Sequence, residues 1–451
     1  MKKVLIANRG EIASRVIRTC KRLGIETVAV YSEADAEMPF VKEADDAFLI
    51  GPPPIQQSYL KGEDIIQLAL RENVDAIHPG YGILSENGEF VERVEAAGIT
   101  FIGPDAQTIK KMGDKIVSRQ TMQSASVPVV PGTDEGIISL DEALEIAGEL
   151  GYPVMLKASA GGGGVGMIRC EDEQALSQQF DSVKNRAKMY FGSDAVFLEK
   201  FITNARHIEV QIFGDAFGNI VHLFERNCSV QRRNQKVIEE APSPDLSETA
   251  KNKLYEAAIN AAKAVDYKNA GTVEFIVDKD EHVYFLEMNT RLQVEHPITE
   301  EITGFDLVEW QIEVAKGNEL PVKDQSQINA KGHALEFRLY AEDPRTFMPS
   351  PGEITTLDFG GGDGIRVDNG YGENSKVTPF YDPLISKIIV RAKTRDEAIE
   401  KSKAYLASVA VEGLKTNLPL FTEILNEAAF VKGDYTTSII GDWLENLKGV
   451  K

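Results

Sequence analysis

The first hundred residues alternate between apolar strands and amphipathic helices, and this alternation limits the fold more than any other feature. The strand patterns cover 2–7, 26–32 and 74–80, and the helix patterns cover 10–24, 63–73 and 88–98. Such alternation predicts an open, largely parallel α/β sheet. Ligands of these sheets bind beyond the carboxyl ends of the strands, which places residues 7–12 and 78–87 on the site side. Ordinary strand-to-helix turns are the alternative for both segments.

The pattern changes near residue 113 and again near residue 330. The middle part mixes helices with antiparallel-looking strands, and the last part combines short strands with a helix pattern over 395–411. We expect an N-terminal α/β domain over 1–113, a second domain over 114–330 and an α+β domain over 331–446. A chain of 451 residues, 43% of them hydrophobic, has enough apolar material for this division.

The net charge and the cysteines limit which binding partners and which cellular compartment are expected. A net charge of −21 disfavours nucleic acid and anionic membranes, so clustered cations are expected to serve a local anion. The three cysteines, Cys20, Cys170 and Cys228, have neither disulfide nor metal-site spacing. Because there is also no signal peptide or membrane span, we expect a cytoplasmic protein that binds neither nucleic acid nor membrane.

Four consecutive glycines interrupt the stretch KASAGGGGVGMIRC. Gly161, Gly163 and Gly166 match G-x-G-x-x-G, but that fingerprint must open a helix, and MIRC has the pattern of a strand. A glycine loop between two strands predicts a flap whose backbone closes on a polyphosphate, with Lys157 at its root. A plain hairpin without a ligand is the alternative.

The stretch GTVEFIVDKDEHVYFLEMN predicts an acidic hairpin. With a turn centred on Asp280 and Glu281, Glu274 lies directly opposite Glu287, and Asn289 shares the same face. Directly opposed carboxylates are destabilising unless a cation lies between them. Two carboxylates and an amide oxygen are typical ligands of Mg²⁺ that bridges nucleotide phosphates. A solvated acidic face is the alternative.

Two further groups of charged residues predict a small anionic substrate. The face of the acidic hairpin continues through Arg291 to Glu295, which suits a small anion that must lose a proton. A basic segment follows residue 227 and contains Arg232, Arg233 and Lys236.

The basic segment has two compatible interpretations. Lys236 could bind the substrate, while the neighbouring arginines, Arg232 and Arg233, could be structural and pair with Glu239 and Glu240. Both interpretations fit a chain in which concentrated positive charge is rare.

Several long segments together resemble one enzyme family. They are IANRGEIA, HPGYGILSEN, MGDK, KASAGGGGVGM, HIEVQI, NCSVQRRNQK, EMNTRLQVEHPITE, EFRLYAEDP and FYDPLISK, in the order of the family and over nearly the whole chain. The chain is similar to biotin carboxylase, the ATP-grasp component that carboxylates biotin in acetyl-CoA carboxylase and related acyl-CoA or pyruvate carboxylases.

The resemblance implies a reaction and its cofactors. ATP, with Mg²⁺ that Mn²⁺ can replace, phosphorylates bicarbonate to carboxyphosphate, and the CO₂ formed from it is captured at N1′ of biotin. This is an ADP-forming ligase reaction and the first half-reaction of a carboxylase that feeds fatty acid synthesis or related acyl-CoA metabolism. The middle domain is then an ATP-grasp domain whose glycine-rich lid spans about 131–203.

The resemblance also implies roles for individual residues. The expected ATP-binding residues are Lys115, Lys157, Gly161, Gly162, Gly163, Gly164, Glu199, Lys200, Phe201, Ile202, His207, Asn234, Glu274 and Glu287. Glu274, Glu287 and Asn289 are the expected metal ligands. Lys236, Arg291 and the backbone of Val294 are expected to bind bicarbonate. Glu295 is the expected base, and Arg338 is expected to stabilise the enolate-like biotin.

Three positions depart from the pattern that many members of the family share. Ala160 stands where Gly is frequent, Val165 where Arg or Lys is frequent, and Asn234 where His is frequent. The lid therefore has one cation fewer, and Asn234 can form hydrogen bonds but cannot be protonated. None of the three removes a residue that the resemblance assigns to the chemistry.

The resemblance implies partners as well. The sequence has no Met-Lys-Met biotinyl segment and no acyl-CoA transferase region. We expect biotin to arrive on a separate biotin carboxyl carrier protein, separate carboxyltransferase subunits to take the carboxyl group, and the chain to form a homodimer. The alternatives are another ATP-grasp ligase, which RLQVEHP and EFRLYAEDP disfavour, a non-catalytic nucleotide-binding subunit, and a dinucleotide-dependent dehydrogenase.

Overall fold

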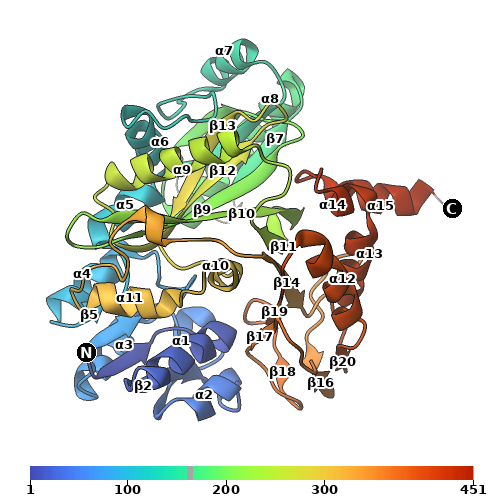
Figure 1. Cartoon of the computed structure of the whole chain (residues 1–451). Coiled ribbons are helices and arrows are strands. Elements are labelled where there is room, and N and C mark those ends of the chain that lie inside the picture. The colour runs from blue at the N-terminus through green and yellow to red at the C-terminus, as the bar shows by residue number, and fades with distance from the viewer. Residues whose placement is uncertain (160–165, 450–451) are drawn as a thin grey trace.

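The alternating N-terminal segments form a parallel sheet in the order β3-β2-β1-β4-β5 (Figure 1). The computed structural model describes residues 1–159 and 166–449. The strands are β1 (Lys3–Ile6), β2 (Glu26–Ser32), β3 (Asp46–Gly51), β4 (Ala76–His78) and β5 (Thr100–Phe101). The helices are α1 (Gly10–Arg22), α2 (Pro39–Glu43), α3 (Gly62–Arg71), α4 (Gly88–Ala96) and α5 (Ala106–Gly113). The predicted strands and helices of this region are confirmed.

A long sheet runs from the middle of the molecule into its C-terminal part, in the order β13-β12-β9-β10-β11-β14-β19-β17 (Figure 1). All of its neighbouring strands are antiparallel. Its strands are β9 (Arg206–Gly214), β10 (Ile220–Arg232), β11 (Gln235–Ala241), β12 (Asn269–Val277), β13 (Val283–Asn289), β14 (His333–Tyr340), β17 (Ile365–Asn369) and β19 (Leu384–Ala392). The sheet passes without a break from β11 to β14, across the proposed boundary near residue 330.

The strands before and after the glycine stretch form a small separate sheet with β8, in the order β7-β6-β8. Its strands are β6 (Val154–Ala158), β7 (Met167–Cys170) and β8 (Val196–Lys200), and its helices are α7 (Leu140–Leu150) and α8 (Glu173–Phe191). Because β7 follows the loop as an antiparallel partner of β6, the predicted strand is confirmed and the dinucleotide turn is excluded. Gly161–Gly164, Ala160 and Val165 lie outside the described residues.

The remaining elements cover the long sheet and complete the C-terminal part. The helices are α6 (Lys115–Ser124), α9 (Glu248–Lys263), α10 (His296–Thr303), α11 (Leu307–Ala315), α12 (Arg395–Leu406), α13 (Leu418–Asn426), α14 (Ala428–Lys432) and α15 (Ile439–Gly449). The short strands are β15 (Gly352–Glu353), β16 (Thr356–Asp358), β18 (Lys376–Val377) and β20 (Ala410–Glu412). The predicted helix over 395–411 is too long, because residues 410–412 pair with β16 instead.

The two faces of the long sheet differ at β12. Val273 and Phe275 are fully buried and belong to the same apolar cluster as Leu254 and Ala258 of α9. Glu274, between them, projects to the opposite face. Burying the apolar face under α9 fixes the register of β12, and a slip of one residue would exchange the two faces. The polar side chains of β12, including Glu274, therefore lie on the face of the sheet that α9 does not cover.

No helix within residues 1–159 and 166–449 has both the length and the apolar character needed to cross a bilayer.

The start of α6 generates a prediction for stability. Asp114 caps this helix, because its carboxylate accepts hydrogen bonds from the backbone N–H groups of Ile116 (2.9 Å) and Val117 (3.1 Å). We expect Asp114→Ala to lower the free energy of unfolding by about 1 kcal/mol, and Asp114→Asn to retain most of it. Chemical denaturation measures both values, and equal losses in the two variants would contradict the capping role.

Candidate active site

The acidic hairpin places Glu274 opposite Glu287, as predicted. The register arises differently from the prediction, because Val277 pairs with Val283 and a bulge then shifts the pairing between Phe275 and Glu274. Glu274 accepts hydrogen bonds from Lys236 Nζ at 2.8 Å and Asn289 Nδ2 at 2.9 Å. It also accepts one from Gln293, and His207 Nε2 lies 2.8 Å from its other oxygen. Burial would raise the pKa of Glu274, but Lys236 and His207 outweigh it and lower this pKa.

Lys236 lies at the centre of the site. From β11 its ammonium group donates to Glu209 Oε2 (2.5 Å), Glu274 Oε1 (2.8 Å) and Glu295 Oε1 (2.7 Å). Burial opposes the charged form of Lys236, but the three carboxylates prevail and hold its pKa well above the usual range. The sheet and the start of α10 therefore bring the predicted base to the predicted anion-binding lysine.

Arg338 bridges two glutamates beside Lys236. Its Nη2 donates to Glu295 Oε2 at 2.8 Å, and its Nε donates to Glu239 Oε1 at 2.5 Å. Lys236 and Arg338 together outweigh the burial of Glu295 and hold its pKa well below the usual range. The predicted residues Lys236, Glu295 and Arg338 thus form one contiguous cluster.

Arg291 joins this cluster to the N-terminal part of the chain. Its Nε donates to Glu86 Oε2 at 2.8 Å, and its Nη2 donates to Asn289 Oδ1 at 2.9 Å. Glu86 belongs to segment 78–87, which the strand order places at the site. The carbonyl of Val294 accepts a hydrogen bond from Lys387 Nζ at 2.9 Å.

Several of the predicted nucleotide residues lie in or beside the small sheet. Lys157 forms an ion pair with Glu199, which Arg119 also contacts at 3.3 Å. Lys200 Nζ donates to the carbonyl of Gly151 at 2.7 Å. Burial and the charge of Lys157 lower the pKa of Lys115. Glu199 and Lys200 form the C-terminal end of β8, and Phe201 and Ile202 follow it. Because Lys200 pairs with Val154, this end of β8 lies beside the start of β6, at the end of the small sheet away from the glycine loop.

The basic segment forms the hairpin between β10 and β11. Asn234, with a φ of +63°, and Arg233, with a φ of +50°, form its exposed two-residue turn, a conformation that asparagine tolerates well. Within the described residues, Asn234 has no hydrogen bond to the cluster around Lys236. The alternative pairing was wrong: Arg232 pairs with Glu342, and Arg233 donates to the carbonyl of Thr346.

Sequence reasoning missed two buried residues that order the site. Arg226 is fully buried and donates to Glu209 at 2.5 Å and to Gln293 at 2.9 Å, as well as to Gln211, Thr272 and Thr299. Glu209 is fully buried between Arg226 and Lys236. A signal existed in HIEVQI, where His207, Glu209 and Gln211 alternate with apolar residues and so share one face.

The two opposed carboxylates fit a hard divalent cation. Within the described residues, Glu287 accepts no hydrogen bond, and burial together with the charge of Glu274 raises its pKa. A cation between Glu274 and Glu287 would remove this repulsion. Asn289 fits less directly, because its carbonyl oxygen already accepts from Arg291.

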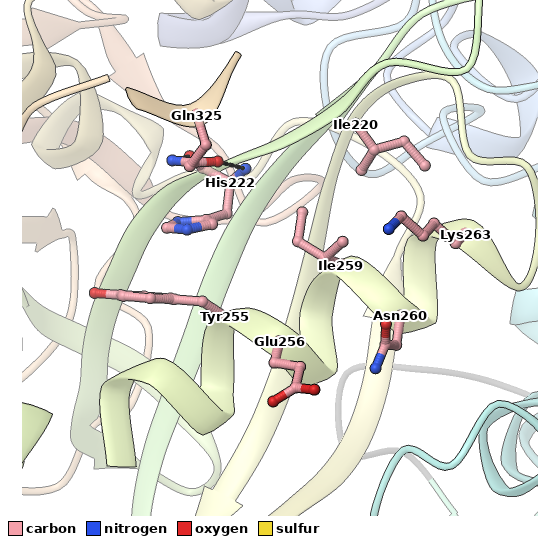
Figure 2. A pocket seen from close by; sticks show the side chains of 8 residues that line it. All are labelled: Ile220, His222, Tyr255, Glu256, Ile259, Asn260, Lys263 and Gln325. Carbon is pink, nitrogen blue, oxygen red and sulfur yellow. Dashed lines mark hydrogen bonds between the residues drawn. The ribbon is translucent and has the colours of Figure 1, made fainter. Parts of the chain in front are cut away.

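A separate cavity lies beside α9 and contains none of the predicted site residues. It is lined by Ile220, His222, Tyr255, Glu256, Ile259, Asn260, Lys263 and Gln325 (Figure 2). The rings of His222 and Tyr255 stack with centroids 4.1 Å apart, and Gln325 forms hydrogen bonds with the backbone of His222. His222, Tyr255 and Gln325 are thus engaged with one another, and we assign the cavity no ligand.

Three family models cover most of the chain. Residues 1–109 match "Biotin carboxylase, N-terminal domain", residues 114–323 match "Carbamoyl-phosphate synthase L chain, ATP binding domain", and residues 336–442 match "Biotin carboxylase C-terminal domain".

Curated relatives agree with these models over the full length of the chain. The biotin carboxylase of Halalkalibacterium halodurans is 53% identical over 444 residues, with 98% of each chain covered. Biotin carboxylase 2 of Bacillus subtilis is 55% identical over 438 residues, with 97% of this chain and 98% of the relative covered.

A solved structure shows the same fold with ligands bound. The biotin carboxylase domain dimer of the Hydrogenobacter thermophilus 2-oxoglutarate carboxylase, in complex with MgADP, ADP and bicarbonate, has a TM-score of 0.95 and 47% identity, with 98% of this chain and 97% of that chain covered. The resemblance, the fold class, the enzyme class and the cofactors inferred from the sequence are confirmed. The chain belongs to the biotin carboxylase family, the ATP-dependent ligases that carboxylate biotin in the first half-reaction of the biotin-dependent carboxylases.

Proposed function

We propose that the cluster of Lys236, Arg291, Glu295 and Arg338 binds bicarbonate, activates it for phosphorylation by ATP and then carboxylates biotin. The observation that carries this proposal is the position of Glu295, whose two oxygens contact Lys236 and Arg338 on opposite sides. A carboxylate held between two cations is suited to receive a proton from an anion that those same cations attract.

The low pKa of Glu295 is consistent with a base that is activated by its substrate. Without a bound anion, Lys236 and Arg338 stabilise the ionised carboxylate and make it a weak base. Bicarbonate bound to Lys236 and Arg291 would partly neutralise the positive charge that acts on Glu295. The pKa of Glu295 would therefore rise as the substrate binds. The O–H proton of bicarbonate then moves to Glu295, and the freed oxygen attacks the γ-phosphorus while ADP leaves.

The remaining residues of the cluster have complementary roles in the proposal. Glu274 and Glu287, with Asn289 as a third ligand, would hold Mg²⁺, which neutralises the nucleotide phosphates when bound. Lys115 and Lys157 would contact those phosphates beneath the glycine lid. Carboxyphosphate would break down to CO₂ and phosphate, and this phosphate would accept the N1′ proton of biotin while N1′ attacks CO₂. Arg338 would stabilise the negative charge that develops on the ureido oxygen in this step.

We further propose that biotin is presented on a separate carrier protein, that separate carboxyltransferase subunits use the carboxylated carrier, and that the chain acts in the cytoplasm as a homodimer. The dimer of the Hydrogenobacter thermophilus domain supports the last point. The domain division at residues 113 and 330, with a lid over about 131–203, also belongs to this proposal.

A bicarbonate-dependence assay tests the proposed reaction. ADP formation should require bicarbonate and should rise when free biotin is added. Hydrolysis of ATP at the same rate with and without bicarbonate would contradict the proposal and favour another ATP-grasp ligase.

The role of Glu295 yields a kinetic prediction. We expect Glu295→Gln to lower kcat for biotin carboxylation by roughly 10²- to 10⁴-fold, because the general base is lost. Binding of MgADP should persist in this variant, because Glu295 accepts hydrogen bonds from Lys236 and Arg338, neither of which is among the expected ATP-binding residues. Calorimetric titration with MgADP is the control, and wild-type turnover in the variant would contradict the assigned role.

The opposed carboxylates yield a prediction for magnesium. We expect Glu287→Gln to raise the free energy of unfolding by roughly 0.5 kcal/mol without metal, because it removes a like-charge pair. The same variant should lose most of the stabilisation that MgADP gives the wild type. Thermal denaturation measures both effects, with Glu256→Gln on the exposed face of α9 as the control for charge. A variant less stable than the wild type without metal would contradict the repulsion.

A further inference from the structure

Two glutamates that the proposed reaction leaves unused face each other behind the active site. Glu239 on β11 pairs directly with Glu336 on β14, so the two side chains project from the same face of the sheet. Figure 1 shows the two strands side by side. Both residues are fully buried. Directly opposed residues of an antiparallel pair have Cβ atoms about 5 Å apart, which brings the two carboxyl groups within reach of each other.

Three of the four carboxyl oxygens in this pair accept no hydrogen bond within the described residues. They are Oε2 of Glu239 and both oxygens of Glu336. The fourth, Oε1 of Glu239, accepts from Arg338 Nε at 2.5 Å. Buried polar groups are almost always partnered, so three unpartnered oxygens at one place need an explanation.

The charged groups around the pair cannot balance two ionised carboxylates. Arg338 is already shared with Glu295, and Lys236 with three other glutamates. On β19, fully buried Lys387 donates to the carbonyl of Val294 and forms an ion pair with Glu11 at 3.1 Å. His296 on α10 is also buried. Its burial and the nearby charge of Lys387 disfavour protonation of the imidazole and lower the pKa of His296.

A single proton on the pair accounts for the buried oxygens that have no donor among the described residues and for the close approach of the two carboxyl groups. A protonated carboxyl group is a donor as well as an acceptor, so an O–H of Glu336 can donate to the unpartnered Oε2 of Glu239. The pair then has one negative charge instead of two and leaves fewer unpartnered oxygens. Two ionised carboxylates would instead each incur the full cost of desolvating a charge.

We propose that Glu239 and Glu336 share a single proton and act as a positioning pair for Arg338. The shared proton holds Glu239 in place, and Glu239 in turn fixes the guanidinium beside Glu295. With one negative charge in the pair rather than two, more of the positive charge of Arg338 is directed to the reacting groups. The effect on catalysis rests on the proposed role of Arg338, whereas the shared proton does not.

The electrostatic environment supports this assignment. Burial, together with the charge of Glu239, raises the pKa of Glu336 well above its usual range against the opposing effect of Lys387. Burial raises the pKa of Glu239 to about 7, although Arg338 acts in the opposite direction. Adjacent Glu240 is equally buried on the other face, but His333 and Arg395 hold its pKa at about 2.

Infrared difference spectroscopy tests for the shared proton. At neutral pH, the wild type minus Glu336→Gln should show the C=O stretch of a buried protonated carboxyl group. The wild type minus Glu240→Gln should lack this band, because Glu240 is ionised and paired with Arg395. The absence of the band from the first difference would overturn the proposal, whatever the activity of the variants.

Kinetics test the consequence for Arg338. In Glu336→Gln the amide can donate to Glu239 as the acid does, so this variant should keep most of the wild-type kcat. In Glu336→Leu the donor is lost, and we expect kcat for biotin carboxylation to fall about tenfold through a loosened guanidinium, with KM for ATP unchanged. Thermal denaturation establishes that the leucine variant is folded.

The kinetic outcomes separate the two proposals. A folded Glu336→Leu variant with wild-type kcat would overturn the positioning role, as would equal loss in the glutamine and leucine variants. If Arg338→Lys retained full activity while the infrared band was present, the shared proton would stand and the proposed role of Arg338 would fail.

Discussion

The contact of one ammonium group with three glutamates is the interaction on which the site depends. Lys236 on β11 reaches past β10 to Glu209 on β9 and Glu274 on β12, and it also holds Glu295 at the start of α10. A buried ammonium without partners would be costly, and so would the buried carboxylates alone. Each group therefore requires the others, and the relative placement of four separate segments is fixed by one charge.

Much of the fold follows from local patterns in the sequence. The N-terminal alternation gave the parallel sheet because apolar strands and amphipathic helices have distinct periods. The opposition of Glu274 and Glu287 was also predicted correctly, although the turn was misplaced. The bulge next to Phe275 restores the pairing, and an extra residue of this kind leaves no clear trace in the alternation.

The parts that could not be predicted depend on pairing between distant segments. Glu239 and Glu336 are almost a hundred positions apart, and only the pairing of β11 with β14 brings them together. The sequence also did not indicate which glutamate pairs with Arg232. Glu239 is close to Arg232 in the sequence, but Arg232 pairs with Glu342 in the fold. Composition indicates that cations are scarce, whereas only the sheet order determines which carboxylate each one meets.

This pairing has a consequence for the anion binding that we propose for a strongly acidic chain. Four of the cations proposed to meet substrates have a carboxylate partner in the described structure: Lys157 has Glu199, Arg291 has Glu86, Lys236 has three glutamates, and Arg338 has Glu239 and Glu295. An incoming anion must therefore replace part of an existing ion pair. An anion that contacts a single cation gains little binding free energy from this exchange, because the displaced carboxylate loses its partner. An anion that several cations contact at once is favoured, and substrate binding would then release Glu295, the carboxylate that we propose as the base.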